Sequence, residues 1–225
     1  MNPLQTELQR LYQAPEGQVR VLVLELARPA DWSLLGPLWR GVQTDLALPA
    51  PAIAVSGVDG YQLWFSLAEP VAAAEGAAFL EGLRRHYLGT VAPGRITASP
   101  ALSAQGGYTA PPAPGQQQPA TGYWSAFVAP DLAPIFADEP WLDQSPSPDA
   151  QASVLVRLQS IQPAAFAATL ARLRPPVPSA LPSQAPVAAQ PLTPKLFLLA
   201  VMNDRGMDMQ LRIEAAKALL PYFER

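Results

Sequence analysis

The residues best suited to chemistry in this sequence lie between positions 52 and 67 (AIAVSGVDGYQLWFSL). Residues 53–56 and 61–67 have strand composition, and the glycines between them predict a hairpin turn. The second strand would carry an amide and an indole on a half-buried face, where they could hydrogen-bond and stack on a base. The turn could offer N–H groups to a phosphate, although two glycines also suit an ordinary turn. The candidate ligand-binding residues are Ser56, Gly57, Gly60, Gln62, Trp64 and Ser66.

The composition excludes several other kinds of site. The chain has no cysteine, so it has no disulfide and no thiolate ligand. Its one histidine, His86, excludes a multi-histidine metal site, and its place beside two arginines on a predicted helix favours a solvated side chain. The net charge of −3 argues against a strongly electropositive nucleic-acid surface. We expect neither a cofactor nor a bound metal ion.

Six predicted elements would position the candidate residues. They are strands at 19–26, 53–56, 61–67 and 94–99, and helices within 29–48 and 70–88. The order strand, helix, strand, strand, helix, strand is that of the split βαβ, ferredoxin-like or RNA-recognition-like fold. The sequence therefore predicts an α+β fold of the βαββαβ type, with both helices on one sheet face and the other face free.

Alternation along the strands assigns the polar candidates to the free face. Side chains two residues apart in a strand share a face, so Glu25 would lie on the same side as Gln62, Trp64 and Ser66. Trp64 could then stack on a base. The alternative is that later helices, or Trp124 and Trp141, cover it.

The chain divides by composition into three parts. Residues 1–174 form the α+β domain, with a Pro-, Gly- and Gln-rich loop at 104–122. Residues 175–193 are a Pro- and Ala-rich linker, and residues 194–225 are predicted to form a helical hairpin. Two short helices cannot bury both of their faces alone, so we expect 194–225 to bind a protein partner or to self-associate.

The strand order and the segment SGVDGYQLWFSL resemble the archaeo-eukaryotic primase superfamily, including plasmid-replication primases. Members of that family carry a strand that ends in an Asp-x-Asp pair, and later a Ser-Gly-x-x-Gly-x-His segment that runs into aromatic residues. Glu25 and Ala27 fall at the position of the acid pair, Arg28 follows them, and residues 56–65 fall on the second motif. The resemblance spans about residues 19–88.

The departures from the family pattern indicate lost catalysis. The resemblance implies a site in which carboxylates hold divalent cations at nucleotide phosphates. Ala27 cannot be such a ligand, and Gln62 occupies the position of the family's histidine. Glu25 therefore marks a degenerate metal position, and Arg28 joins the candidate nucleic-acid-binding residues. The alternative is a residual metal-dependent nucleotidyl-transfer enzyme, which would need Glu25 to converge with a later acid, Asp131 or Asp138.

A second resemblance concerns the C-terminal part. Residues 192–224 are similar to the helical hairpin of small terminase subunits, over about 30 residues. The apolar pattern suits any helical hairpin, so it does not by itself predict DNA binding.

These observations predict a non-catalytic, primase-like protein with a nucleic-acid-associated or adaptor role in replication or in a mobile element. Single-stranded nucleic acid is the expected partner. The alternative is a protein–protein interaction module that binds no nucleic acid. No run of about 18 apolar residues and no signal-peptide pattern is present, so we expect a cytoplasmic protein without a membrane partner.

Overall fold

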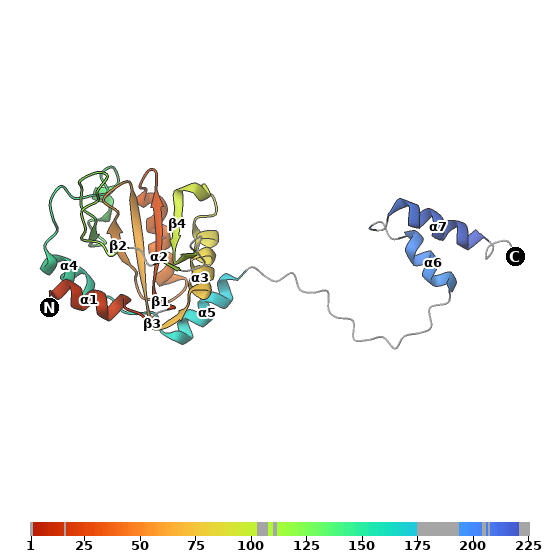
Figure 1. The fold of residues 1–225 in the computed structure, drawn as a ribbon, viewed down its shortest axis with the longest axis horizontal. Helices are drawn as coiled ribbons and strands as arrows, with labels where there is room; N and C mark the ends of the chain where they lie inside the picture. The colour runs from red at the N-terminus through yellow and green to blue at the C-terminus, as the bar shows by residue number, and fades with distance from the viewer. Residues whose placement is uncertain are drawn as a thin grey trace. The chain divides into compact units, whose positions relative to one another are not determined.

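The computed structural model describes residues 2–15, 17–102, 108–109, 112–174, 194–203, 206 and 208–220. They belong to two compact units, Met1–Pro175 and Pro176–Arg225, which are described separately (Figure 1). The predicted linker at 175–193 and part of the predicted loop at 104–122 lie outside the described residues.

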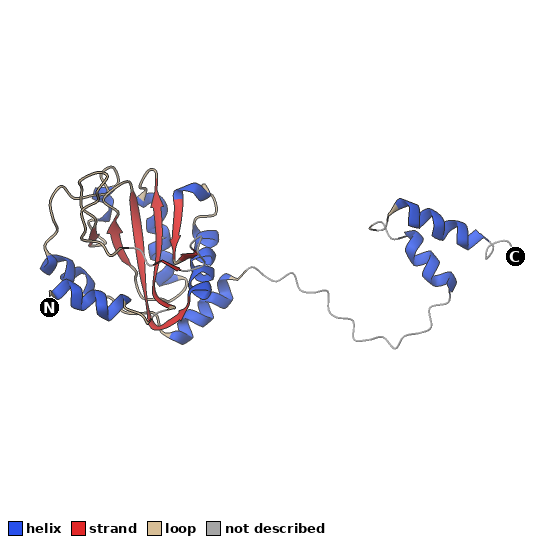
Figure 2. Cartoon of the chain, in the orientation of Figure 1, coloured by secondary structure: helices blue, strands red, loops and turns tan. Residues whose placement is uncertain are grey.

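The first unit is built on a five-stranded antiparallel sheet with the strand order β4-β1-β3-β2-β7. Figure 2 shows this sheet in red among the blue helices. Strands β5 and β6 form a separate antiparallel pair. The predicted α+β class is therefore confirmed. The strands are β1 (Gln18–Ala27), β2 (Ala52–Val55), β3 (Gly60–Ala72), β4 (Ile96–Ser99), β5 (Ala101–Leu102), β6 (Tyr108–Thr109) and β7 (Ala126–Val128).

Five α-helices of this unit pack around the sheet. They are α1 (Pro3–Tyr12), α2 (Trp32–Thr44), α3 (Ala73–Tyr87), α4 (Pro148–Leu155) and α5 (Pro163–Leu173), with short 3₁₀ turns at Pro93–Arg95 and Ala133–Phe136. Helix α2 begins after Asp31, whose carboxylate accepts hydrogen bonds from two N–H groups of the first turn. Pro37 lies inside α2, which continues through it to Thr44.

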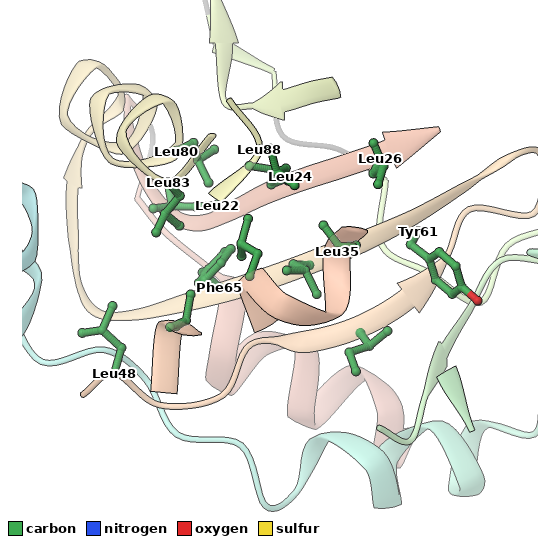
Figure 3. Close-up of a cluster of buried hydrophobic side chains, with 14 of the residues drawn as sticks. Leu22, Leu24, Leu26, Leu35, Leu48, Tyr61, Phe65, Leu80, Leu83 and Leu88 are labelled. Carbon is green, nitrogen blue, oxygen red and sulfur yellow. The ribbon is translucent and has the colours of Figure 1, made fainter. Parts of the chain in front are cut away.

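One sheet face carries the main hydrophobic core (Figure 3). Leu22, Leu24 and Leu26 alternate along β1 on this face and are fully buried. They pack in one cluster with leucines of α2 and with Phe79 and Leu83 of α3, while α5 adds further apolar side chains. Burial of each large side chain stabilises the fold by about 1.5–3 kcal/mol. The predicted packing of the two crossover helices on this face is thus observed.

The opposite face is covered, in contrast to the prediction that it is free. Helices α1 and α4 contact each other, and they pack on β1, β3 and β7. Leu11 of α1 and Leu155 of α4 are fully buried in a second cluster with Val21, Val23 and Trp64. The sheet therefore lies between two helical layers.

Strand β3 is longer than predicted. Its pairing with β1 continues past an irregularity between Val19 and Val21, so that Gln18 still lies opposite Ala72. The added ladder hydrogen bonds carry the strand through Pro70, where the sequence predicts the beginning of a helix. Helix α3 begins only at Ala73.

The second unit contains helices α6 (Pro194–Asn203) and α7 (Met209–Leu219). Asp208 caps α7 by accepting a hydrogen bond from the N–H of Gln210, and Arg212 Nε donates to the carbonyl of Met202 at 3.0 Å. Four large apolar side chains of α7 and its C-cap are exposed: Met209, Leu211, Ile213 and Leu220. None of the helices in the described residues is long and apolar enough to cross a membrane.

Candidate ligand-binding surfaces

Glu25 and Gln62 form the polar part of the covered sheet face. They lie opposite each other on β1 and β3, and Gln62 Nε2 donates to Glu25 Oε2 at 3.3 Å. Trp64 Nε1 donates to Gln62 Oε1 at 2.9 Å, which completes a chain of three side chains. The structure therefore brings together three of the predicted site residues, but their polar atoms are directed toward one another.

Burial raises the pKa of Glu25, and the charge of Asp59 adds to this effect. The hydrogen bond from Gln62 and the charge of Arg28 act in the opposite direction. Because desolvation is the largest influence, the Glu25 carboxylate is a costly anion in this position.

In the structure Trp64 is not accessible to a base. Its side chain is 2% exposed, because Tyr12 of α1 and Phe127 of β7 pack on the indole with ring centroids 5.5 and 5.7 Å away. The alternative, that the protein covers Trp64 internally, describes the structure. The covering residues are, however, Tyr12, Phe127 and α4 rather than Trp124 or Trp141.

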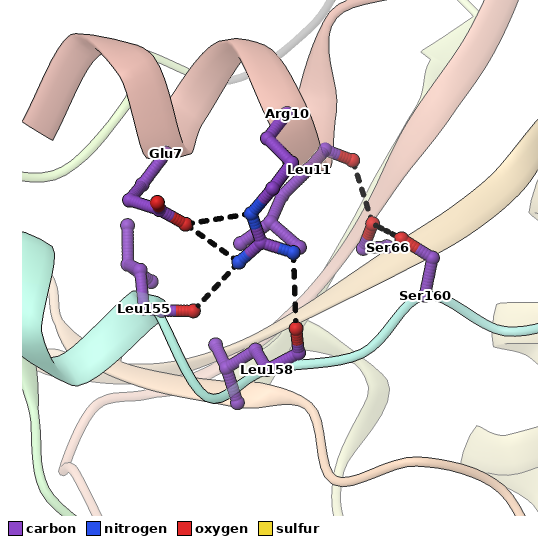
Figure 4. A network of polar contacts seen from close by, with 7 residues as sticks. All are labelled: Glu7, Arg10, Leu11, Ser66, Leu155, Leu158 and Ser160. Atoms are coloured by element: carbon purple, nitrogen blue, oxygen red, sulfur yellow. Dashed lines mark hydrogen bonds and ion pairs between the residues drawn. The ribbon is translucent and has the colours of Figure 1, made fainter.

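Ser66, another predicted site residue, is also covered in the structure. Its side chain is buried, and its hydroxyl donates to the carbonyl of Leu11 at 2.6 Å (Figure 4). The hydroxyl oxygen of Ser160 lies 2.7 Å from the hydroxyl oxygen of Ser66. Ser66 therefore joins α1 and the segment after α4 to the sheet.

The turn at residues 56–60 does not cradle a phosphate. Ser56 Oγ is buried and accepts hydrogen bonds from the N–H groups of Val58, Asp59 and Gly60 at 3.0–3.1 Å. The N–H of Gly57, a residue with φ of +78°, donates to the carbonyl of Pro140. The N–H groups that a phosphate would need are thus already used.

Gly60 has a structural reason to be glycine. A Cβ atom there would come within 2.8 Å of Glu25 Oε1 and 2.9 Å of the Ala27 side chain. Glycine at position 60 therefore makes room for the Glu25 carboxylate.

Arg28 remains accessible at the end of β1. Its guanidinium donates to the carbonyl of Gly94, and its backbone N–H donates to the carbonyl of Asp59 at 3.3 Å. Its φ of +56° lies in the left-handed region, which turns the chain out of the strand.

The metal-dependent alternative gains no cluster of acids from the structure. Among the described residues, no group of three or more His, Cys, Asp or Glu side chains is arranged so that it could hold a metal ion. Glu25, Asp131 and Asp138 are all among the residues searched.

A cavity of about 590 Å³ lies near the C-terminal end of α1 and the N-terminal end of α5. Its lining contains Arg10 and Arg20 but no carboxylate. Three polar side chains from the segment between α4 and α5 also line it: Gln159, Ser160 and Gln162. We refer to it as the arginine pocket. It was not predicted from the sequence, although an arginine at position 20, within a mostly apolar strand, is an unusual signal.

The two arginines of this pocket differ in their partners, and Figure 4 shows those of Arg10. Arg10 forms an ion pair with Glu7 at 2.6 Å and donates to the carbonyls of Leu155 and Leu158. Arg20 donates from Nε to the carbonyl of Leu67 at 2.7 Å and has no ion pair with any described residue. Arg20 therefore supplies the uncompensated positive charge of the pocket.

Helix α5 adds to the positive character of the arginine pocket. Gln162 and Ala165, which line the pocket, are its N-cap and a residue of its first turn. Its first residue, Pro163, has no N–H, and no side-chain hydrogen bond caps this end of the helix, so the positive end of its dipole lies beside the cavity without a capping group. An anion is the ligand that this environment favours.

A pH-dependent prediction follows from Glu25. Its pKa is higher in the folded state than in the unfolded chain, so ionisation opposes folding. This destabilisation is absent below the unfolded pKa of about 4.3 and fully present above the folded pKa. We expect Glu25→Gln to be more stable than the parent chain at pH 7, with the difference shrinking below about pH 4.

Urea unfolding of the two chains at both pH values measures this difference, and the exposed Glu69→Gln variant is the control. A stability difference between Glu25→Gln and the parent chain that does not change with pH would contradict the raised pKa of Glu25.

The comparisons with known proteins add a likeness of fold. No family model matches the chain, and no curated protein matches it. The solved structures it resembles include the polymerase domain from Mycobacterium tuberculosis Ligase D in complex with DNA, with a TM-score of 0.39 and 20% sequence identity. The match covers 65% of this chain and 57% of that chain, so the chain spans little more than half of its neighbour. The likeness is weak and concerns the fold alone.

Proposed function

We propose that the Met1–Pro175 unit is a non-catalytic, primase-like module that associates with single-stranded nucleic acid in the cytoplasm. The order β4-β1-β3-β2 of its first four main strands supports assignment to the RNA-recognition-like βαββαβ class. The polar chain from Glu25 to Trp64 supports the loss of nucleotidyl transfer. Its carboxylate is hydrogen-bonded to Gln62, and Ala27 lies where a second acid would be needed.

The observation that carries the nucleic-acid part of the proposal is the arginine pocket. It combines an unpaired arginine, an uncapped helix N-terminus and polar side chains without a lining carboxylate. Phosphate oxygens accept hydrogen bonds from arginine and from helix N–H groups. The pocket thus takes over the binding role that the sequence analysis assigned to the sheet face.

The exposed apolar side chains of α7 support a second role as an adaptor. Leu211 and Ile213 lie on α7 with about half of their surface in solvent. Exposed apolar side chains gathered on one short helix are typical of an association surface. We propose that the Pro176–Arg225 unit supplies this surface. Its sequence is similar to the helical hairpin of small terminase subunits.

Titration of a fluorescein-labelled single-stranded oligonucleotide at 50 mM salt tests the nucleic-acid role. We expect Arg20→Ala to weaken binding by about five- to tenfold, because one charge-assisted phosphate contact is lost. Arg40→Ala removes the same charge from an exposed position on α2 and is the matched control.

Equal losses in both variants would show that only net charge matters and would overturn the assignment of the pocket. The non-catalytic part is tested separately, by incorporation of nucleotides on a primed template with Mg²⁺ or Mn²⁺. Incorporation that Glu25→Gln abolishes would contradict it.

A further inference from the structure

A second cleft lies at the opposite end of the sheet from the arginine pocket. It has a volume of about 610 Å³ and lies between the connection from β1 to α2, the turn from β2 to β3 and residues 134–141. Its walls carry two tryptophans, Trp32 and Trp141, and several prolines. We refer to it as the tryptophan cleft. Neither tryptophan was among the predicted binding residues.

Both indoles are held in place by a second aromatic ring. Trp32 packs on Tyr61 with ring centroids 5.5 Å apart, and Trp141 stacks on Tyr123 at 4.8 Å with an interplanar angle of 13°. The two walls are also tied together, because the N–H of Gly57 donates to the carbonyl of Pro140 at 3.0 Å. The rings are therefore fixed in position before any ligand binds, which lowers the entropy cost of binding.

The charge that lines the tryptophan cleft is negative. Asp31, Asp59 and Asp138 contribute to its walls, and no lysine, arginine or histidine of the described chain does so. The side chains of Asp59 and Asp138 form no hydrogen bond with a described residue, whereas the Asp31 carboxylate caps α2. Burial raises the pKa of Tyr61, and the nearby charges of Asp138 and Asp31 raise it further. A cation would relieve this negative potential.

The rim of the cleft carries exposed apolar side chains beside its acids. Val58 is 39% exposed and lines the cleft, and Ile135, which follows the lining residue Pro134, is 72% exposed. Exposed apolar side chains around a concave site are typical of surfaces that bind another polypeptide. The rim therefore suits a partner that is larger than a free small cation.

We propose that the tryptophan cleft binds a lysine or arginine side chain of a partner polypeptide. The cation lies against the faces of Trp32 and Trp141, and Asp59 and Asp138 compensate its charge. The apolar rim contacts the residues on either side of it. This site shares no residue with the arginine pocket, so it is independent of the proposed nucleic-acid binding.

The test uses the full chain and two pentapeptides that differ only in their central residue, arginine or its neutral isostere citrulline. Indole N–H signals in ¹H–¹⁵N spectra report on binding. We expect the arginine peptide to shift the signals of Trp32 and Trp141. The signals of Trp39 and Trp64 should stay in place, since these indoles donate to Pro51 and Gln62 inside the fold.

We expect the arginine peptide to bind about tenfold more tightly than the citrulline peptide. Asp138→Asn should lower the affinity about threefold to tenfold without disturbing the packing. Trp141→Ala, which also removes the stack with Tyr123, should lower the affinity as well. Asp131→Asn, an exposed acid outside the lining, is the matched control.

Three results would overturn the proposal. They are equal affinity for the two peptides, equal losses in Asp138→Asn and Asp131→Asn, and tetramethylammonium binding as tightly as the arginine peptide. The last result would assign the cleft to a free small cation instead of a partner side chain.

Discussion

Gln151→Leu is expected to destabilise the Met1–Pro175 unit by about 2–5 kcal/mol, because it leaves two buried backbone groups of an edge strand without partners. Gln151 extends from α4 and is 5% exposed. Its Oε1 accepts a hydrogen bond from the N–H of Phe127 at 2.6 Å, and its Nε2 donates to the carbonyl of the same residue at 3.0 Å. The side-chain amide thus takes the place of a sixth strand beside β7.

A charged isostere refines this prediction. An ionised Gln151→Glu side chain can still accept from the N–H of Phe127, but it has no donor for the carbonyl. Protonation restores a donor, so we expect the loss of stability in this variant to be larger at pH 7 than at pH 4.

Urea unfolding followed by circular dichroism measures both variants. Gln9→Leu, a change of the same kind at an exposed position on α1, should stay within about 0.5 kcal/mol of the parent chain. A Gln151→Leu variant as stable as this control would show that water satisfies Phe127 and that Gln151 does not hold the edge strand.

The main elements of the first unit could be predicted because each has a strong local signal. The apolar run of β1 is long enough for a strand that is buried on both faces, and the residues between β2 and β3 have clear turn chemistry. The end of β3 could not be predicted in the same way. Pro70 favours a break by local rules, but pairing with β1 carries the strand beyond it.

The candidate site was harder to predict because it depends on contacts between distant parts of the chain. An amphipathic helix at the N-terminus can be recognised from its leucine spacing, but the sheet face that it covers cannot be read from that spacing. Tyr12 meets Trp64 across more than fifty residues, and Arg10 reaches carbonyls near position 155. These contacts close the predicted face and create the arginine pocket.

Trp64→Ala is expected to distinguish a sheet face that belongs to the core from one that binds a base. If Trp64 belongs to the core, the variant should lose about 3–5 kcal/mol of stability, as large aromatic truncations in cores do. Its indole packs with Tyr12 and Phe127 in one cluster, so the truncation would leave a cavity between α1 and the sheet. Trp64→Phe keeps a ring but loses the hydrogen bond to Gln62, and we expect a smaller loss of about 1–2 kcal/mol.

Binding of the single-stranded oligonucleotide completes the test. It is measured at 10 °C, and the concentration of each variant is corrected for the folded fraction given by circular dichroism. We expect Trp64→Phe to bind like the parent chain and Arg20→Ala to bind more weakly, because phosphate contacts at the arginine pocket do not involve the indole. A Trp64→Ala variant that kept its stability but lost binding would mean that the indole meets a base, and that α1 leaves the sheet when nucleic acid binds.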